Sequence, residues 1–246
     1  MISELWVWLI LFLPLCSFVV IGLGIRPFMA GYSHLSGVLT IVSIGASFGL
    51  SLWALGSVMA DHATVDSWTP HTWLTVGDLE IDVGILLDPL TALMLVVVTG
   101  VSLLVQIYST GYMKGDPSYA RYFAFMSLFT ASMVGLVIAS NIIQLYVFWE
   151  LVGLCSFLLI GFWHQRPAAA AAAKKAFIIT RLGDFGFLLA ILYLFMHSDS
   201  IPGNALDIRD LTHKLPLAIA AGTVPLAVAT WAGLGIFAGA VGKSGQ

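Results

Sequence analysis

Seven apolar segments, each close to the length that crosses a lipid bilayer as a helix, constrain the fold of this 246-residue chain. They cover residues 4–25, 33–58, 88–110, 120–139, 141–162, 169–196 and 217–242. Hydrophobic residues make up 59% of the chain and charged residues only 9%, which excludes an ordinary soluble domain. Because lipid offers the backbone no hydrogen-bond partner, such segments must be helical. The sequence therefore predicts an all-α, polytopic membrane helix bundle of seven transmembrane helices.

Lysine and arginine residues lie mainly in alternate loops, and this asymmetry predicts the orientation of the chain. One set of loops contains Arg26, Lys114, Arg121, Arg166, Lys174 and Lys175, whereas the opposite set contains only Arg209 and Lys214. Since basic loops tend to stay in the cytoplasm, we expect an extracytoplasmic N-terminus.

The segment 59–87 is then predicted to be an extracytoplasmic loop, and it carries acids but no lysine or arginine. Residues 71–87 alternate between apolar and polar side chains, which is compatible with a short β-hairpin. Because the alternating pattern is short, we expect an ordinary loop instead.

Glu150 lies in the middle of the fifth apolar segment. A helix places it about 14 Å from Asn141, near the midplane of the hydrocarbon core. A carboxylate at that depth costs on the order of 3 kcal/mol. Tyr146 and Gly153 share its helix face, where they offer a hydroxyl group and room for another helix. Glu150 therefore indicates charge or proton handling in the membrane; the alternative is a structural acid hydrogen-bonded between helices.

Asp184 is a second acid within an apolar segment, and Arg181 precedes it by three residues. Lys174 lies on roughly the same helix face, and Lys175 follows it. One interpretation is a self-neutralised Arg181–Asp184 pair, with both lysines extending their ammonium groups to the interface. The other is a switchable pair that tunes a neighbouring proton site. The spacing leaves both interpretations open.

Lys243 ends the last apolar segment and, by local sequence, is an end-of-helix lysine. Two features favour another interpretation. Pro225 predicts that the helix begins late, and the glycine-rich residues before Lys243 predict a broken helix lining a polar cavity. A lysine there could face Glu150, forming a pair whose protonation depends on the distance between the two groups.

The sequence contains no pattern typical of a cofactor site. Cys16 and Cys155 have no metal or disulfide spacing, and all six histidines lie at segment edges or in loops. No glycine-rich loop matches a nucleotide fingerprint. We therefore expect no redox centre, cofactor or metal in this chain, and no nucleic-acid partner.

Several motifs resemble those of the antiporter-like subunits of respiratory complex I. They are residues 88–94 (DPLTALM), 111–113 (GYM), 119–123 (YARYF), 148–163 (FWELVGLCSFLLIGFW), 174–184 (KKAFIITRLGD) and 239–244 (GAVGKS). In combination they resemble the L-type, distal chain-5 subunit of proton-pumping NADH:quinone oxidoreductase. Residues 152–156 (VGLCS), which follow Glu150, favour the L type over the M and N types and over Mrp-type antiporters. The resemblance covers about residue 80 to the end.

This resemblance implies a translocase subunit, with residues 1–246 as the N-terminal part of an antiporter-like proton-channel domain. Glu150 and Lys243 would form the first half of a proton path, and Arg181 with Asp184 the ion pair that modulates it. Lys174, Lys175 and Tyr146 would support them. Because family members are much longer, we expect a truncated chain.

The resemblance also implies the surroundings of the chain. NADH, FMN, iron–sulfur clusters and quinone would belong to partner subunits, with an M-type antiporter-like subunit as neighbour. The chain would be multi-pass in an energy-transducing membrane, such as a bacterial inner membrane. Alternatives are a subunit of a cation/proton antiporter or bicarbonate-uptake assembly, or a scaffold whose buried charges are locally neutralised.

Overall fold

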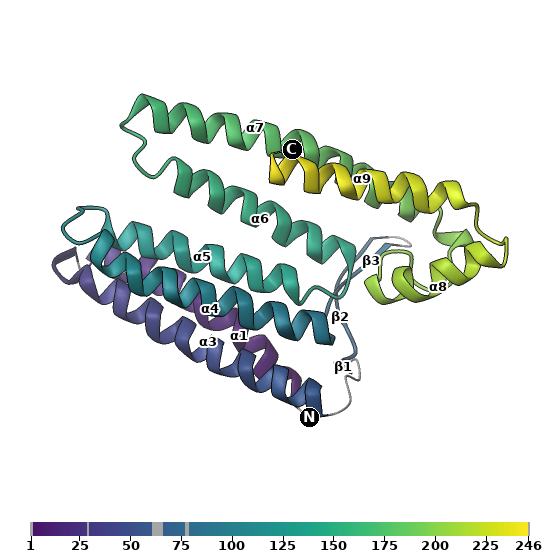
Figure 1. Ribbon diagram of the computed structural model, residues 1–246, viewed down its shortest axis with the longest axis horizontal. Coiled ribbons are helices and arrows are strands. Elements are labelled where there is room, and N and C mark those ends of the chain that lie inside the picture. The colour runs from purple at the N-terminus through teal and green to yellow at the C-terminus, as the bar shows by residue number, and fades with distance from the viewer. Residues whose placement is uncertain (1, 29, 61–65, 77–78, 246) are drawn as a thin grey trace. The chain divides into compact units, whose positions relative to one another are not determined.

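The computed structural model describes residues 2–28, 30–60, 66–76 and 79–245, which form helices and two short sheets (Figure 1). The chain divides into a first unit, Met1–Thr69 with Ile85–Ile138, and a second unit, Pro70–Gly84 with Ala139–Gln246. In the described ranges, 7 helices are long and apolar enough to cross a membrane. The predicted multi-pass helical bundle is therefore confirmed.

The first unit contains four membrane-length helices. α1 (Glu4–Val19) continues through a π-helical turn (Val20–Ile25) into the short α2 (Arg26–Phe28). The others are α3 (His34–Ala60), α4 (Pro89–Tyr112) and α5 (Tyr119–Val137). The strands β1 (Asp66–Ser67) and β4 (Leu86–Leu87) pair antiparallel. The Asp88 carboxylate caps α4 by accepting the Thr91 N–H at 2.6 Å, with Pro89 in the first helical position.

Hydroxyl groups connect the helices of the first unit. Ser17 of α1 donates to Ser127 of α5 at 2.9 Å, and Thr99 of α4 donates to Ser51 of α3 at 3.3 Å. Such bonds stabilise helix packing where lipid offers no polar partner. The acids and bases predicted to form a functional site all lie in the second unit.

The second unit contains α6 (Ile142–Ile160), α7 (Pro167–Met196), α8 (Ile208–Ala220) and α9 (Leu226–Ser244), with a 3₁₀ turn at Ser198–Ser200. The prediction that the seventh segment begins at residue 217 is wrong. Residues 208–220 form the separate helix α8, and the chain enters the last span only after Pro225, which cannot donate a backbone hydrogen bond. The predicted break in the glycine-rich end is also wrong, because α9 stays helical to Ser244.

α8 carries three of the five charged residues between the last two spans, Arg209, Asp210 and Lys214. Asp207 caps it by accepting the N–H groups of Arg209 and Asp210. Burial acts to raise the pKa of Asp210, but hydrogen bonds from the Lys214 side chain and the Asn204 N–H lower it below its ordinary value. α8 is therefore a polar connection between spans.

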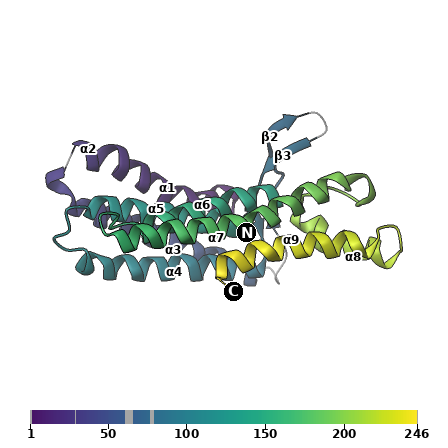
Figure 2. The ribbon, with the colours of Figure 1, turned by 90° about the horizontal axis from the view of Figure 1, so that it is seen from above.

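A β-hairpin occupies part of the segment that we expected to be an ordinary loop. β2 (His71–Val76) pairs antiparallel with β3 (Leu79–Val83), and the hairpin projects beyond the helices of its unit (Figure 2). The expectation of a plain loop is therefore wrong. Hydrogen bonds between the two backbones stabilise the strands even though the alternating pattern is short. The rest of the predicted loop includes residues 61–65 and 77–78, which lie outside the described residues.

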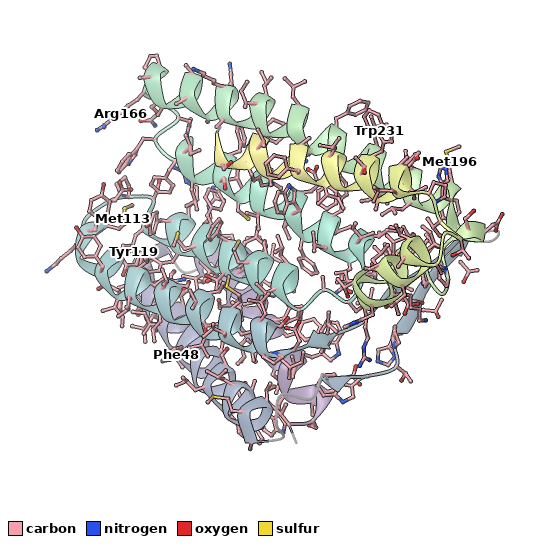
Figure 3. All side chains as sticks on the ribbon, turned by 45° about the vertical axis from the view of Figure 1, so that its right-hand side comes forward. Phe48, Met113, Tyr119, Arg166, Met196 and Trp231 are labelled. Carbon is pink, nitrogen blue, oxygen red and sulfur yellow. The ribbon has the colours of Figure 1, made fainter. Side chains whose placement is uncertain are left out.

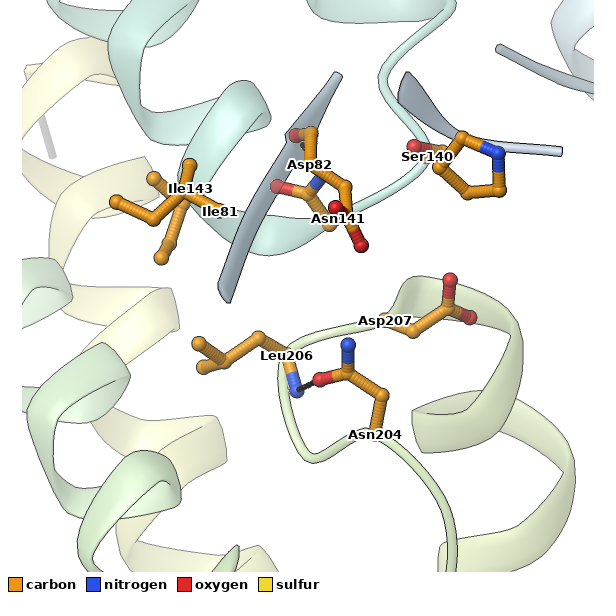
Figure 4. A pocket seen from close by; sticks show the side chains of 9 residues that line it. Ile81, Asp82, Ser140, Asn141, Ile143, Asn204, Leu206 and Asp207 are labelled. Atoms are coloured by element: carbon orange, nitrogen blue, oxygen red, sulfur yellow. Dashed lines mark hydrogen bonds between the residues drawn. The ribbon is translucent and has the colours of Figure 1, made fainter. Parts of the chain in front are cut away.

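The start of α6 is held by two other segments. Asn141 caps the helix by accepting the Gln144 N–H at 2.8 Å, and its side-chain amide donates to the Asp82 carbonyl of β3 at 2.8 Å. The Ile142 N–H donates to the Leu206 carbonyl at 2.9 Å. These segments line a small polar pocket (Figure 4). The contacts fix the start of α6 relative to β3 and to the segment before α8.

Glycines let α7 and α9 pack closely along their length (Figure 1). A Cβ atom added at Gly183 would lie 2.8 Å from the Ala238 carbonyl oxygen and 2.9 Å from the Gly242 Cα. One added at Gly235 would lie 2.7 Å from the Gly186 carbonyl oxygen. The two helices therefore run antiparallel in backbone contact, as small residues allow between membrane helices.

The outward surface of this helix pair is apolar. Met196 of α7 is 79% exposed and Trp231 of α9 is 64% exposed (Figure 3). Such side chains are unfavourable in water over a wide surface and are expected where helices face lipid.

We expect Gly183→Ala to destabilise the full-length protein by about 2 kcal/mol, because the added methyl meets backbone atoms that cannot move aside. The measurement is the midpoint of thermal unfolding in mild detergent. Gly233→Ala on α9 is the matched control, because a Cβ there meets nothing within 4 Å. Equal midpoints for the two variants would contradict the packing of α7 on α9.

Candidate functional site

Four charged side chains gather at the middle of α6. Glu150 lies eight residues after Ile142, about 12 Å along the helix. Arg181 and Asp184 reach this level from α7, and Lys243 reaches it from α9. We call Glu150, Arg181, Asp184 and Lys243 the charge cluster. Its two acids and two bases balance in formal charge, which reduces the cost of burial.

Glu150 and Arg181 form the first ion pair of the charge cluster, through Oε2 and Nη1. The other terminal nitrogen of Arg181 donates to the Glu150 backbone carbonyl at 3.2 Å. The guanidinium carbon also lies 4.7 Å from the centre of the Phe177 ring. The planar guanidinium thus contacts both the backbone and the side chain of one residue.

Asp184 is the most buried member of the charge cluster, with 1% of its side chain exposed. The indole N–H of Trp149 donates to its Oδ1 at 2.6 Å, and Lys243 Nζ lies 3.8 Å from its Oδ2. The Trp149 ring in turn packs edge-on against Phe187 at 5.7 Å. A buried carboxylate requires such partners, because an isolated charge at this depth is strongly unfavourable.

Lys243 lies deep in the unit although it is close to the end of α9. Its Nζ donates to the Trp149 carbonyl at 2.6 Å and lies 4.9 Å from the centre of that residue's ring. Its side chain is only 17% exposed. Lys243 is in the last turn of α9, as its local sequence predicts, but α9 ends beside the middle of α7, so its ammonium group lies inside the unit.

The partners within the charge cluster differ from those expected. The sequence motifs predicted the pairs Glu150–Lys243 and Arg181–Asp184, whereas the structure pairs Glu150 with Arg181 and Asp184 with Lys243. The i, i+3 spacing made a pair within α7 plausible. The tertiary arrangement instead brings α6 beside α7, where one residue offers Arg181 both a carboxylate and a carbonyl.

The structure does not bring Lys174 and Lys175 to the charge cluster. Both are exposed and lie about two helical turns from Arg181. The preceding Ala173 is level with Gly161 at the end of α6, since a Cβ atom on that glycine would lie 3.1 Å from the Ala173 Cβ. This position suits lysines that extend to the interface.

Tyr146 and Trp149 pack on the same ring. The Tyr146 ring lies 5.3 Å from the Phe187 ring, one turn of α6 before Glu150. Sequence reasoning missed Trp149, which contacts two members of the charge cluster. The available signal was a tryptophan next to a buried acid, because a buried indole N–H needs an acceptor.

Within the described ranges, no three His, Cys, Asp or Glu side chains could hold a metal ion.

Two family models match the chain and define its class. Residues 73–123 match the model described as "NADH-Ubiquinone oxidoreductase (complex I), chain 5 N-terminus". Residues 139–246, which contain the charge cluster, match "NADH:quinone oxidoreductase/Mrp antiporter, TM". The chain belongs to this family of antiporter-like membrane subunits.

Curated relatives place the chain within that family. It is 42% identical over 242 residues to "NAD(P)H-quinone oxidoreductase chain 5" of Synechocystis sp., which covers 97% of this chain and 34% of the relative. It is 44% identical over 244 residues to the chloroplastic subunit 5 of Zygnema circumcarinatum, which covers 98% of this chain and 34% of the relative. The predicted resemblance to chain 5 is confirmed, and the chain spans about a third of the length of these relatives.

Two solved structures share the fold. A chain of the Mrp complex from Dietzia sp. DQ12-45-1b has a TM-score of 0.74 at 24% identity, covering 96% of this chain and 23% of that chain. A chain of the membrane-bound sulfane sulfur reductase, an archaeal respiratory membrane complex, has a TM-score of 0.68 at 18% identity. The match covers 96% of this chain and 44% of that chain. The chain therefore shares its fold with a chain of each of these two membrane complexes.

We expect Asp184→Asn to destabilise the full-length protein by about 3 kcal/mol, because it leaves the Lys243 ammonium buried beside a neutral amide. Lys243→Met in the same chain should restore most of that loss. Thermal unfolding in mild detergent measures both effects. Lys214→Met, in an exposed pair, serves as the control and should cost less than about 1 kcal/mol. A double variant as unstable as the single variant would contradict the Asp184–Lys243 pairing.

Proposed function

We propose that this chain is part of a proton-translocating membrane subunit of an NADH:quinone oxidoreductase complex. The charge cluster carries this proposal, because four buried ionisable groups, contributed by three membrane-length helices and gathered beside the middle of α6, are expensive to maintain without a role in charge movement. Residues 1–246 would form the N-terminal part of an antiporter-like proton-channel domain. The family and the chain-5 relatives support the assignment.

Proton transfer would use exchange of partners within the charge cluster. In the structure, Arg181 neutralises Glu150 and Lys243 lies near Asp184. If Arg181 moves toward Asp184 on its own helix, Lys243 is left to pair with Glu150. A carboxylate that loses its cation at this depth favours the protonated form, and an ammonium that loses its anion favours release of a proton. Between the two arrangements Glu150 is without a cation and Lys243 without an anion, so Glu150 would take up a proton from the path and Lys243 would release one to it. Each group would regain its charge when an ion pair forms again, Glu150 by releasing its proton and Lys243 by taking one up.

The energy would come from other subunits. NADH, FMN, iron–sulfur clusters and quinone would react there, and a conformational or electrostatic signal would reach α7 and α9. An M-type antiporter-like subunit is the proposed neighbour on the side of Arg181 and Asp184. The distribution of lysine and arginine supports an extracytoplasmic N-terminus in an energy-transducing membrane, such as a bacterial inner membrane.

A cation/proton antiporter is the second candidate, because the chain shares its fold with a subunit of an Mrp complex. The same charge cluster could couple protons to Na⁺. A bicarbonate-uptake assembly is a further alternative with the same kind of bundle. A scaffold is the third, since the charge cluster is neutral in total and could be only structural.

We expect Glu150→Gln in the full-length protein of the assembled complex to lower the number of protons pumped per electron several-fold, because the amide cannot carry a proton. NADH oxidation and proton uptake into proteoliposomes are measured together, with K⁺ and with Na⁺ as the only alkali cation. Asp199→Asn, at an exposed acid between spans, is the control.

Two outcomes of this experiment would favour another function. Normal proton-to-electron stoichiometry in Glu150→Gln would exclude the proposed role of the acid and favour the scaffold. Proton movement that requires Na⁺ but not NADH would favour the antiporter.

A further inference from the structure

We propose that Gly153 and Trp149 are positioning residues for Lys243. Gly153 leaves the Trp149 carbonyl accessible, and this carbonyl holds the ammonium group in a resting position away from Glu150. The inference rests on the proposed function, because it describes where the Lys243 ammonium group is held between exchanges of ion-pair partner.

The closest acceptor of Lys243 is a backbone carbonyl and not a carboxylate. Nζ lies 2.6 Å from the Trp149 oxygen but 3.8 Å from Asp184 Oδ2. The second distance is longer than a direct hydrogen bond. Since a carbonyl does not titrate, this partner is the same whether Asp184 or Glu150 is protonated. This acceptor is therefore available to Lys243 in every charge state of the two acids.

Gly153 makes the carbonyl accessible. In a helix a side chain covers the turn that precedes it, so a side chain at position 153 would cover the carbonyl of residue 149. A Cβ atom on Gly153 would lie 3.0 Å from Lys243 Nζ and 3.6 Å from Arg181 Nη2. Both cationic groups therefore use the space that glycine leaves empty, and an exchange of their partners would pass through it.

Trp149 holds both members of the second ion pair. Its carbonyl accepts from Lys243, and its indole N–H donates to Asp184 Oδ1 at 2.6 Å. Its ring also lies below the ammonium group and packs against Phe187. One residue thus contacts both Lys243 and Asp184 and sets the separation of their charged groups.

The test substitutes both positioning residues in the full-length protein of the assembled complex. Gly153→Ala removes the resting position, and we expect the protons pumped per electron to fall to about a third or less, since small misplacements of reacting groups have large effects. Trp149→Phe keeps an aromatic ring and the carbonyl but loses the indole N–H, so we expect a smaller decrease. Gly233→Ala, on an open face of α9, is the matched control.

The proton-to-electron ratio separates positioning from a structural role. Defective assembly of the complex would lower NADH oxidation and proton pumping together. Displacement of Lys243 would lower the number of protons pumped per electron while the rate of NADH oxidation stays unchanged. If Gly153→Ala prevents assembly of the complex, the ratio measured for Trp149→Phe tests the inference, because phenylalanine is smaller than tryptophan and adds no steric clash.

Normal ratios in Gly153→Ala and Trp149→Phe, with a low ratio in Glu150→Gln, would overturn this inference and leave the proposed function intact. Normal ratios in all three variants would overturn both.

Discussion

Burial of charge at the middle of α6 is the constraint on which the second unit depends. A single carboxylate at that depth costs on the order of 3 kcal/mol, so Glu150 and Asp184 require cations within reach. Arg181 comes from the facing α7, but Lys243 must be delivered by α9. That delivery requires α9 to run in backbone contact with α7, which the glycines at 183 and 242 allow. The glycine contacts and the charge cluster are therefore parts of one arrangement.

The same four groups permit two sets of pairs, which makes the charge cluster suitable for switching. The structure holds Glu150 with Arg181 and Asp184 with Lys243. The alternative set, expected from the motifs, uses the same groups and has the same total charge. The exchange proposed above would therefore change the partners of the four groups without changing their total charge. In the observed set, Lys243 also donates a hydrogen bond to the neutral Trp149 carbonyl.

The elements predicted well from sequence are those whose physics is local. Apolar segments of sufficient length must be helical in lipid, and the bounds of the first six spans follow from hydropathy. The errors occur where packing or pairing decides. The apolar residues 217–220 belong to α8, and the last span begins only after Pro225. The hairpin at residues 71–83 depends on pairing between two strands. The glycine-rich end of α9 stays helical because its glycines serve close packing on α7.

The sequence by itself determined that this chain forms a multi-pass helical bundle, that its motifs resemble those of chain 5, and that Glu150 and Asp184 lie in apolar segments. Each of these properties depends on composition or on order along the chain. Only the tertiary structure decided that Arg181 pairs with Glu150, that Lys243 lies deep in the unit, and that Trp149 contacts both Asp184 and Lys243. The physical reason is that ion pairs and hydrogen bonds act over a few ångströms, and the spacing between facing helices is not encoded in the sequence of either helix alone.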